Sequence, residues 1–178
     1  GVSNEAQLDQ KALEMCVKEV QSCKRHDYPN FLIMLGDRYG WVPLPNIIEK
    51  TEFEQIFQNI KEEDKEYLLS WYYEDANQVP ISYILEQRTD EYEDYNKWLE
   101  EESRLRNILQ SAVATLDEDI KKKYFTSATE SEAVEGIIPY LHITDFQKKY
   151  QDRKQIDAKH IFGFLRNVNS STAIDDKY

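Results

Sequence analysis

The chain has 178 residues, of which 40% are hydrophobic and 31% charged, so it can bury the core of one globular domain. Its formal net charge is −12, and its Lys and Arg are scattered apart from residues 121–123, which are interpreted as a solvated helix end. A nucleic-acid surface needs clustered cations, a membrane span needs ~18 consecutive apolar residues, and a secreted chain needs a signal peptide. The sequence shows none of these, and it predicts a cytoplasmic protein that binds neither nucleic acid nor membrane.

The first elements predicted along the chain are a helix and a buried strand. The helix extends to about Cys23, and its apolar residues fall on one face: Leu8, Ala12, Leu13, Cys16, Val20 and Cys23. Residues 31–35 (Phe-Leu-Ile-Met-Leu) then form a continuous apolar run. Such a run is typical of a strand that is buried on both faces of a parallel sheet.

Further helices and strands are predicted after a loop that contains Pro43 and Pro45. Short helices are expected to begin at Thr51 and Asp64, and a short strand is expected at residues 82–85. Residues 92–116 carry apolar side chains at spacings of three and four, which predicts a long amphipathic helix.

The last predicted elements are a capped helix and one more strand. Ser127-Ala-Thr-Glu130 and Thr129-Glu-Ser-Glu132 are overlapping capping boxes for one helix that ends near Gly136. Residues 160–168 are predicted to form a buried strand, and the polar residues 169–178 a linker or tail.

Strands that alternate with helices predict an α/β fold with a mainly parallel sheet flanked by helices. The domain is expected over residues 1–168. Cys16 and Cys23 lie about 10 Å apart on the predicted helix, too far for a disulfide. The three histidines show no metal-ligand spacing, so no metal site is expected.

Residues 31–43, Phe-Leu-Ile-Met-Leu-Gly-Asp-Arg-Tyr-Gly-Trp-Val-Pro, resemble the hallmark of a TIR-like domain of unknown function that precedes NACHT and related STAND ATPases. Members include nephrocystin, the telomerase-associated vault protein and many bacterial proteins. Residues 71–88, 127–136 and 161–166 resemble further blocks of this family in the same order. The resemblance implies a TIR-like or flavodoxin-like fold. It also implies that the family's first strand, helix and second strand are missing from this chain.

The resemblance implies a signalling or effector domain with a STAND/NACHT-type ATPase domain in the same polypeptide. Such a domain is expected to act through self-association and recruitment of a partner, and for a bacterial member the setting is antiphage defence. The chain itself lacks a P-loop motif, so the ATPase is expected outside it. A third interpretation is a scaffold that docks onto the ATPase domain, which an exposed apolar patch would favour.

The loop at residues 36–41 follows a predicted strand, which is where open parallel sheets bind ligands. Arg38 could pair with an anion, Asp37 supplies a carboxylate, and Tyr39 and Trp41 could stack on a base or a nicotinamide. One interpretation is a nucleotide pocket. The other is a tight turn, in which Trp41 enters the core and Arg38 pairs with a nearby carboxylate.

Glu52 and Glu54 stand at the start of the helix that begins at Thr51. TIR enzymes that cleave NAD carry a glutamate at the start of the corresponding helix. The resemblance therefore implies, as an alternative, an enzyme that takes NAD as substrate and uses Glu54 or Glu52 to stabilise the ribosyl cation. Thr51-x-x-Glu54 is equally a capping box, and Glu52 favours the helix dipole, so a structural role also stays open.

Overall fold

The computed structural model describes residues 11–23, 31–36 and 39–137, and every structural statement below concerns these residues. The chain divides into two units, residues 1–136 and 137–178. The predicted strand at residues 160–168 and the predicted boundary between residues 168 and 169 lie outside the described residues.

Three short strands form one antiparallel sheet in the order β1-β3-β2. Their bounds are β1 (Ile47–Glu49), β2 (Tyr72–Asp75) and β3 (Ser82–Leu85). Ile48 lies opposite Tyr83, and Tyr73 lies opposite Ile84. The mixed α/β class and the strand at Ser82–Leu85 are confirmed. The predicted mainly parallel sheet is not what these residues form, because the short segment 76–81 can join β2 to β3 only as a hairpin, whereas parallel neighbours need a crossover of about a dozen residues.

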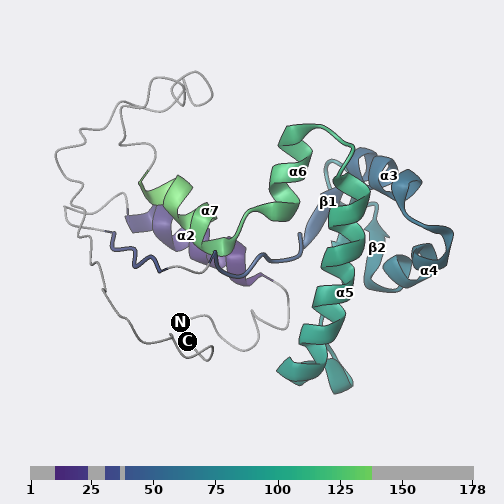
Figure 1. Cartoon of the computed structure of the whole chain (residues 1–178), viewed down its shortest axis with the longest axis horizontal. Helices are drawn as coiled ribbons and strands as arrows, with labels where there is room; N and C mark the ends of the chain where they lie inside the picture. The colour runs from purple at the N-terminus through teal and green to yellow at the C-terminus, as the bar shows by residue number, and fades with distance from the viewer. Residues whose placement is uncertain (1–10, 24–30, 37–38, 138–178) are drawn as a thin grey trace, which may run out of the picture. The chain divides into compact units, whose positions relative to one another are not determined.

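Four helices and one 3-10 turn pack on and around this sheet (Figure 1). Their bounds are α3 (Lys50–Asn59), α4 (Glu62–Trp71), η1 (Asp90–Glu93), α5 (Tyr95–Val113) and α6 (Glu118–Phe125). The long predicted helix is confirmed as α5, and it starts at Tyr95 because the Asp94 side chain accepts hydrogen bonds from the N–H groups of Asn96 and Lys97. Both α3 and α6 contact α5.

The hydrophobic core joins α3, α4 and α5 to the sheet. Its fully or nearly fully buried members come from every one of these elements: Ile48, Phe53, Ile56, Leu68, Tyr72, Leu85, Leu105, Leu109 and Val113. Phe53 stacks on Tyr83 of β3, with the ring centroids 3.7 Å apart and the ring planes 8° apart. This contact fixes α3 against the sheet.

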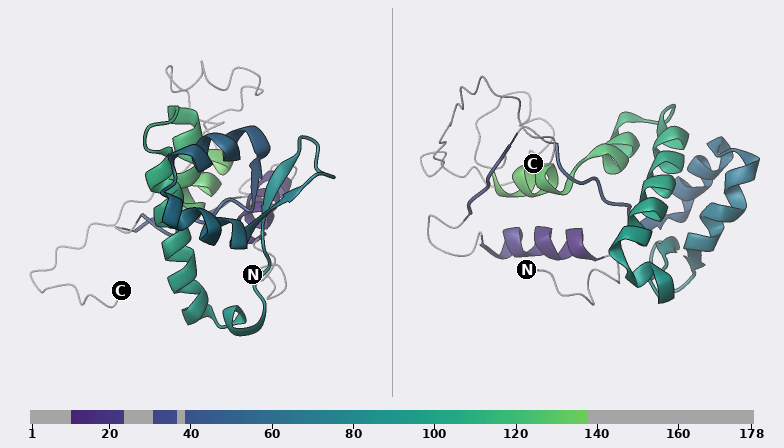
Figure 2. Two further views of the ribbon diagram at one scale, coloured as in Figure 1. Left: turned by 90° about the vertical axis from the view of Figure 1, so that its right-hand side faces the viewer. Right: turned by 60° about the horizontal axis from the view of Figure 1, so that its bottom comes forward.

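The helices α2 (Ala12–Cys23) and α7 (Ala128–Gly136) lie side by side (Figures 1 and 2). The predicted helix that ends at Cys23 and the predicted helix that ends near Gly136 are thereby confirmed. A Cβ at Gly136 would meet the ring of Phe31 at 2.7 Å, so glycine is needed at this close approach.

Residues 31–35 do not form the predicted strand. Phe31 and Ile33 are half-buried, whereas Leu32 is 84% and Met34 87% exposed. The prediction of a strand buried on both faces is therefore wrong for these residues. A continuous apolar run shows that a segment can be buried, but it cannot specify a neighbouring strand, and no strand among the described residues pairs with this one.

Candidate ligand site

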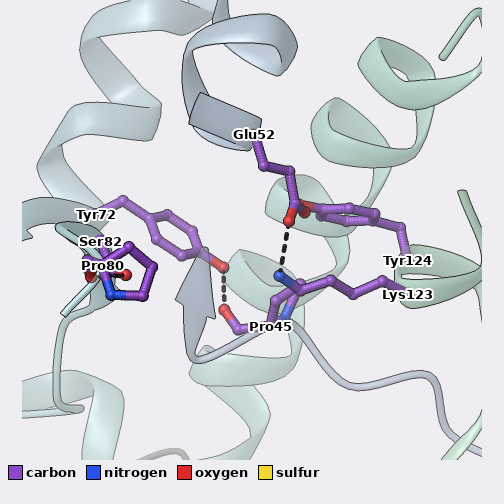
Figure 3. A network of polar contacts seen from close by, with 7 residues as sticks. All are labelled: Pro45, Glu52, Tyr72, Pro80, Ser82, Lys123 and Tyr124. Atoms are coloured by element: carbon purple, nitrogen blue, oxygen red, sulfur yellow. Dashed lines mark hydrogen bonds and ion pairs between the residues drawn. The ribbon is translucent and has the colours of Figure 1, made fainter. Parts of the chain in front are cut away.

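Glu52 points from the first turn of α3 toward α6 (Figure 3). Its carboxylate accepts a hydrogen bond from the Tyr124 hydroxyl and lies 3.2 Å from Lys123 Nζ. Tyr124 is 2% exposed, and burial together with the adjacent Glu52 carboxylate raises the pKa of its hydroxyl. The first of the two predicted catalytic glutamates therefore ties α3 to α6.

A second buried tyrosine lies close by (Figure 3). The Tyr72 hydroxyl donates a hydrogen bond of 2.7 Å to the Pro45 carbonyl, and burial raises the pKa of this hydroxyl. The bond fixes the start of β2 against the segment that leads into β1. Both tyrosines therefore act as neutral donors in the interior.

Glu54 is exposed on α3, and the structure does not bring it to the same site as Glu52. The reason is that helical residues two apart do not share a face. The capping box predicted at Thr51 is wrong, because α3 begins at Lys50 and its N-cap, Glu49, makes no side-chain cap hydrogen bond. Strand β1 continues directly into α3, and the Lys50 N–H donates to the Ile81 carbonyl at 2.9 Å. The sheet thus sets where this helix begins.

Replacing Tyr124 by phenylalanine is expected to lower the free energy of unfolding by about 1–2 kcal/mol, because the partly buried Glu52 carboxylate loses a donor. Urea denaturation measures the change. Tyr73→Phe is the matched control, since Tyr73 is exposed on β2, and it should change stability by less than about 0.5 kcal/mol. Equal effects of the two substitutions would contradict this role for Glu52.

Tyr39, one of the predicted pocket residues, is hydrogen-bonded to the start of α7. The Ser127 Oγ caps this helix by accepting from the Glu130 N–H at 3.1 Å, which confirms half of the predicted capping box. In the other half, no direct hydrogen bond joins the Ser127 N–H to the Glu130 carboxylate, and the Tyr39 hydroxyl contacts both groups instead. It accepts from the Ser127 N–H at 3.2 Å and is in reach of the Glu130 carboxylate and the Phe125 carbonyl as acceptors.

Trp41 connects the same segment to α5. Its indole N–H donates to Glu102 Oε1 at 2.8 Å, and the Arg106 Nη2 lies 2.7 Å from Glu102 Oε2. Arg106 Nε in turn donates to the Val42 carbonyl at 2.7 Å, and the Ala128 N–H donates to the Trp41 carbonyl at 2.9 Å. Residues 39–42 are therefore held between α5 and α7.

The predicted ligand loop is thus only partly described. Asp37 and Arg38 lie outside the described residues, so their side chains cannot be placed. Gly40 has φ +96°, and a Cβ there would meet Thr129 Oγ1 at 3.2 Å, which is the close approach a tight turn against α7 requires. The Tyr39 hydroxyl and the Trp41 indole N–H form hydrogen bonds with glutamate side chains of the protein. The Trp41 ring is half-exposed.

A cavity of about 870 Å³ opens beside Trp41. Residues of α2 line it, together with others that include Leu44, Arg88, Tyr95, Trp98 and Glu102. Neither Glu52 nor Glu54 lines this cavity. The candidate ligand site is therefore next to the predicted loop. It does not include the predicted catalytic glutamates, although Lys123, which lines it, lies 3.2 Å from Glu52.

Arg88, a charged residue that lines this cavity, was predicted only as the end of the family block at residues 71–88 and not as a site residue. It is 7% exposed, and its Cζ lies 5.6 Å from the centroid of the Trp98 ring. Burial lowers the pKa of the guanidinium, and the Glu102 carboxylate partly offsets this effect. Most arginines are exposed, so a sequence gives little warning of a buried one. The sequence signal for a charged group at this place was the spacing of Glu102 and Arg106, which lie one helical turn apart and can form an ion pair.

The described part of the chain offers neither a metal cluster nor a membrane-spanning helix. No group of three or more His, Cys, Asp or Glu side chains there could hold a metal ion. No helix within residues 11–23 or 39–137 is long and apolar enough to cross a bilayer.

The proteins to which this chain is similar are multidomain proteins that carry a NACHT domain. It is 31% identical over 143 residues to NACHT and WD repeat domain-containing protein 2 of Mus musculus, and 30% identical over 143 residues to the Homo sapiens protein of that name. Each match covers 68% of this chain and 8% of the relative. NACHT domain- and WD repeat-containing protein 1 of Mus musculus is 30% identical over 89 residues, which cover 48% of this chain and 6% of that protein.

The chain therefore spans less than a tenth of the length of these relatives. The prediction that the chain is related to proteins with a NACHT domain is confirmed by these similarities. No protein-family model matches the chain, and no solved structure matches it.

Proposed function

We propose that this chain forms part of the N-terminal signalling or effector domain of a STAND-type ATPase whose NACHT domain lies in the same polypeptide. The observation that carries the proposal is the 31% identity over 143 residues to a NACHT and WD repeat protein. The TIR-like relationship belongs to this proposal and rests on the motif at residues 31–43. The similar proteins come from mouse and human, so the antiphage setting stays a prediction.

On this proposal the domain acts by self-association when the ATPase domains assemble. The exposed side of residues 31–35 supports this role. Phe31 and Ile33 are half-buried, while the outward side chains of Leu32 and Met34 are apolar and almost wholly exposed. Leu35 is also exposed, so the alternation holds over residues 31–34. An exposed apolar segment of this kind is suited to docking against another protein surface, by strand addition or by side-chain burial.

The test uses the full-length polypeptide that contains this chain, incubated with ATP and analysed by light scattering. We expect an ATP-dependent oligomer whose population falls at least tenfold when Leu32 and Met34 are both replaced by aspartate. Charged residues would have to be desolvated in the contact, which costs several kcal/mol. Val79→Asp is the matched control, because Val79 is 98% exposed in the segment between β2 and β3. An oligomer that is unaffected by the double substitution would remove residues 31–35 from the interface.

The second candidate function, NAD hydrolysis, requires a glutamate carboxylate that is open to a cleft. Glu52 is instead bonded to Tyr124 and Lys123, and Glu54 is exposed on α3 away from the cavity. These contacts favour a structural role for Glu52. NAD consumption by the ATP-bound oligomer, with Glu52→Gln and Glu54→Gln beside it, separates the two functions. We expect no NAD loss, and turnover that either substitution abolishes would establish the enzyme.

A further inference from the structure

We propose that the cavity beside Trp41 binds a small organic anion, a phosphate or a carboxylate attached to a flat ring, with Arg88 as the group that pairs with the anion. This inference goes beyond the proposed signalling function and does not depend on it. It rests on the burial of Arg88, on the charges around it and on the residues that form the cavity wall.

Arg88 is a buried cation that the nearby Glu102 carboxylate influences, but that pairs directly with no side chain in the described part of the chain. Its guanidinium forms no hydrogen bond or ion pair with any described residue, and its Nε is buried without a hydrogen-bond partner. Leaving a buried charged donor unsatisfied is costly, so buried guanidinium groups are normally paired. A guanidinium offers five donors in a planar fork that matches the oxygens of a carboxylate or a phosphate. An anion in the cavity would satisfy it.

The neighbouring carboxylate is already engaged. Both oxygens of Glu102 have partners, since one accepts from Trp41 and the other is ion-paired with Arg106. The group formed by Arg88, Glu102 and Arg106 therefore carries one net positive charge in a chain whose formal net charge is −12. This excess charge lies at the cavity wall.

The other charged side chains that line the cavity have partners of their own. Lys18 is paired with Glu14, Lys123 lies 3.2 Å from Glu52, and Lys122 lies 3.7 Å from Asp119. Arg88 is the lining cation that has no such partner among the described residues. It is therefore the group that an anionic ligand would meet.

The rest of the wall suits a flat apolar body. The rings of Trp41, Tyr95 and Trp98 and the side chains of Leu44 and Pro45 line the cavity. A volume of about 870 Å³ lies within the range of roughly 300–1,000 Å³ that is usual for small-molecule sites. A mainly apolar wall with one cation fits a ring that carries a single anionic group.

The experiment compares two fluorescent probes that differ in their charge. One is 8-anilinonaphthalene-1-sulfonate, and the other is N-phenyl-1-naphthylamine, which has the same rings without the sulfonate. Both are titrated into the folded 178-residue chain, and quenching of tryptophan emission is followed in parallel, because Trp41 and Trp98 line the cavity and Trp71 does not. We expect the sulfonate to bind at least tenfold more tightly, roughly the effect of one charge-assisted hydrogen bond. Equal affinities would overturn the proposal.

Variants at Arg88 locate the anion. Arg88→Met is expected to abolish the preference for the sulfonate, and Arg88→Lys, which keeps the charge but not the planar fork, to retain part of it. Arg104→Met is the matched control, because Arg104 also stacks on an aromatic ring, that of Tyr67, but lies outside the cavity. A preference that survives Arg88→Met, or that Arg104→Met removes equally, would contradict the assignment. If Arg88→Met fails to fold, Arg88→Lys and the comparison of the two probes still decide.

Competition against the bound sulfonate identifies the kind of anion. Phenyl phosphate and benzoate share the ring and differ in the anionic group, while benzyl alcohol supplies a ring without charge. Displacement by phenyl phosphate alone points to a phosphate ligand, and displacement by benzoate alone to a carboxylate. Displacement by benzyl alcohol as effectively as by either anion would reduce the site to an apolar cavity.

Discussion

Replacing Glu102 by alanine is expected to lower the free energy of unfolding by about 3–5 kcal/mol. Glu102 is 2% exposed and contacts Trp41 and Arg106 with its two carboxylate oxygens. Without it, the buried Arg88 and the partly buried Arg106 lose the nearby negative charge, and the Trp41 indole N–H loses its acceptor. Breaking a buried ion pair from one side leaves an uncompensated charge, which is why the expected effect is large.

Urea denaturation with a two-state fit measures this change. Glu100→Ala is the matched control, because Glu100 is exposed on the same helix, and we expect it to change stability by less than about 0.5 kcal/mol. Glu102→Gln should fall between the two, since an amide oxygen can still accept from Trp41 but carries no charge. A loss below about 1 kcal/mol for Glu102→Ala would show that the segment at residues 39–42 is held by other contacts.

Phe53→Ala is expected to cost a similar amount, about 3–5 kcal/mol. Phe53 is 2% exposed and stacks on Tyr83 of β3, so its removal opens a cavity between α3 and the sheet. The sheet has only three strands, of three or four residues each, and little other area is available to hold α3 against it. Neighbouring groups can therefore fill the space only in part.

Phe57→Ala, one helical turn further along α3, is the control for Phe53→Ala. Phe57 is half-buried, and its ring stacks on Phe53 at a centroid distance of 5.8 Å. We expect about 1–1.5 kcal/mol for its removal, since part of its surface is already exposed to water. Both variants are compared by thermal and by urea denaturation. Equal losses would mean that Phe57 stabilises the packing of α3 as much as Phe53 does.

Local sequence signals predicted two helices well, one from its apolar stripe and one from its cap. In α5, the buried residues Trp98, Leu105 and Leu109 follow the helical period, and in α7 the predicted Ser127 cap is formed. Residues 121–123 were predicted to form a helix end, and Lys122 and Lys123 lie in the last turn of α6. The cap of this helix, where the Asp117 side chain accepts from the Asp119 N–H, was not predicted.

The prediction that Thr51 caps a helix failed for a different reason. Thr51 and Glu54 have the spacing of a capping box. However, β1 leads directly into α3, and the Lys50 N–H donates a hydrogen bond to the Ile81 carbonyl. The backbone bond is a long-range one, between residues far apart in the chain. A capping motif describes a local preference, and a strand that ends at the same place overrides it.

Composition and periodicity by themselves determined that this chain is a mixed α/β protein with α5 as its long amphipathic helix, because burial of an apolar stripe requires only the helical repeat. Tertiary structure decided the antiparallel sheet, the exposed side of residues 31–35 and the burial of Arg88. Each depends on which segments become neighbours, since strand pairing and the pairing of charges join residues far apart in the chain. A local pattern contains no information about such a neighbour.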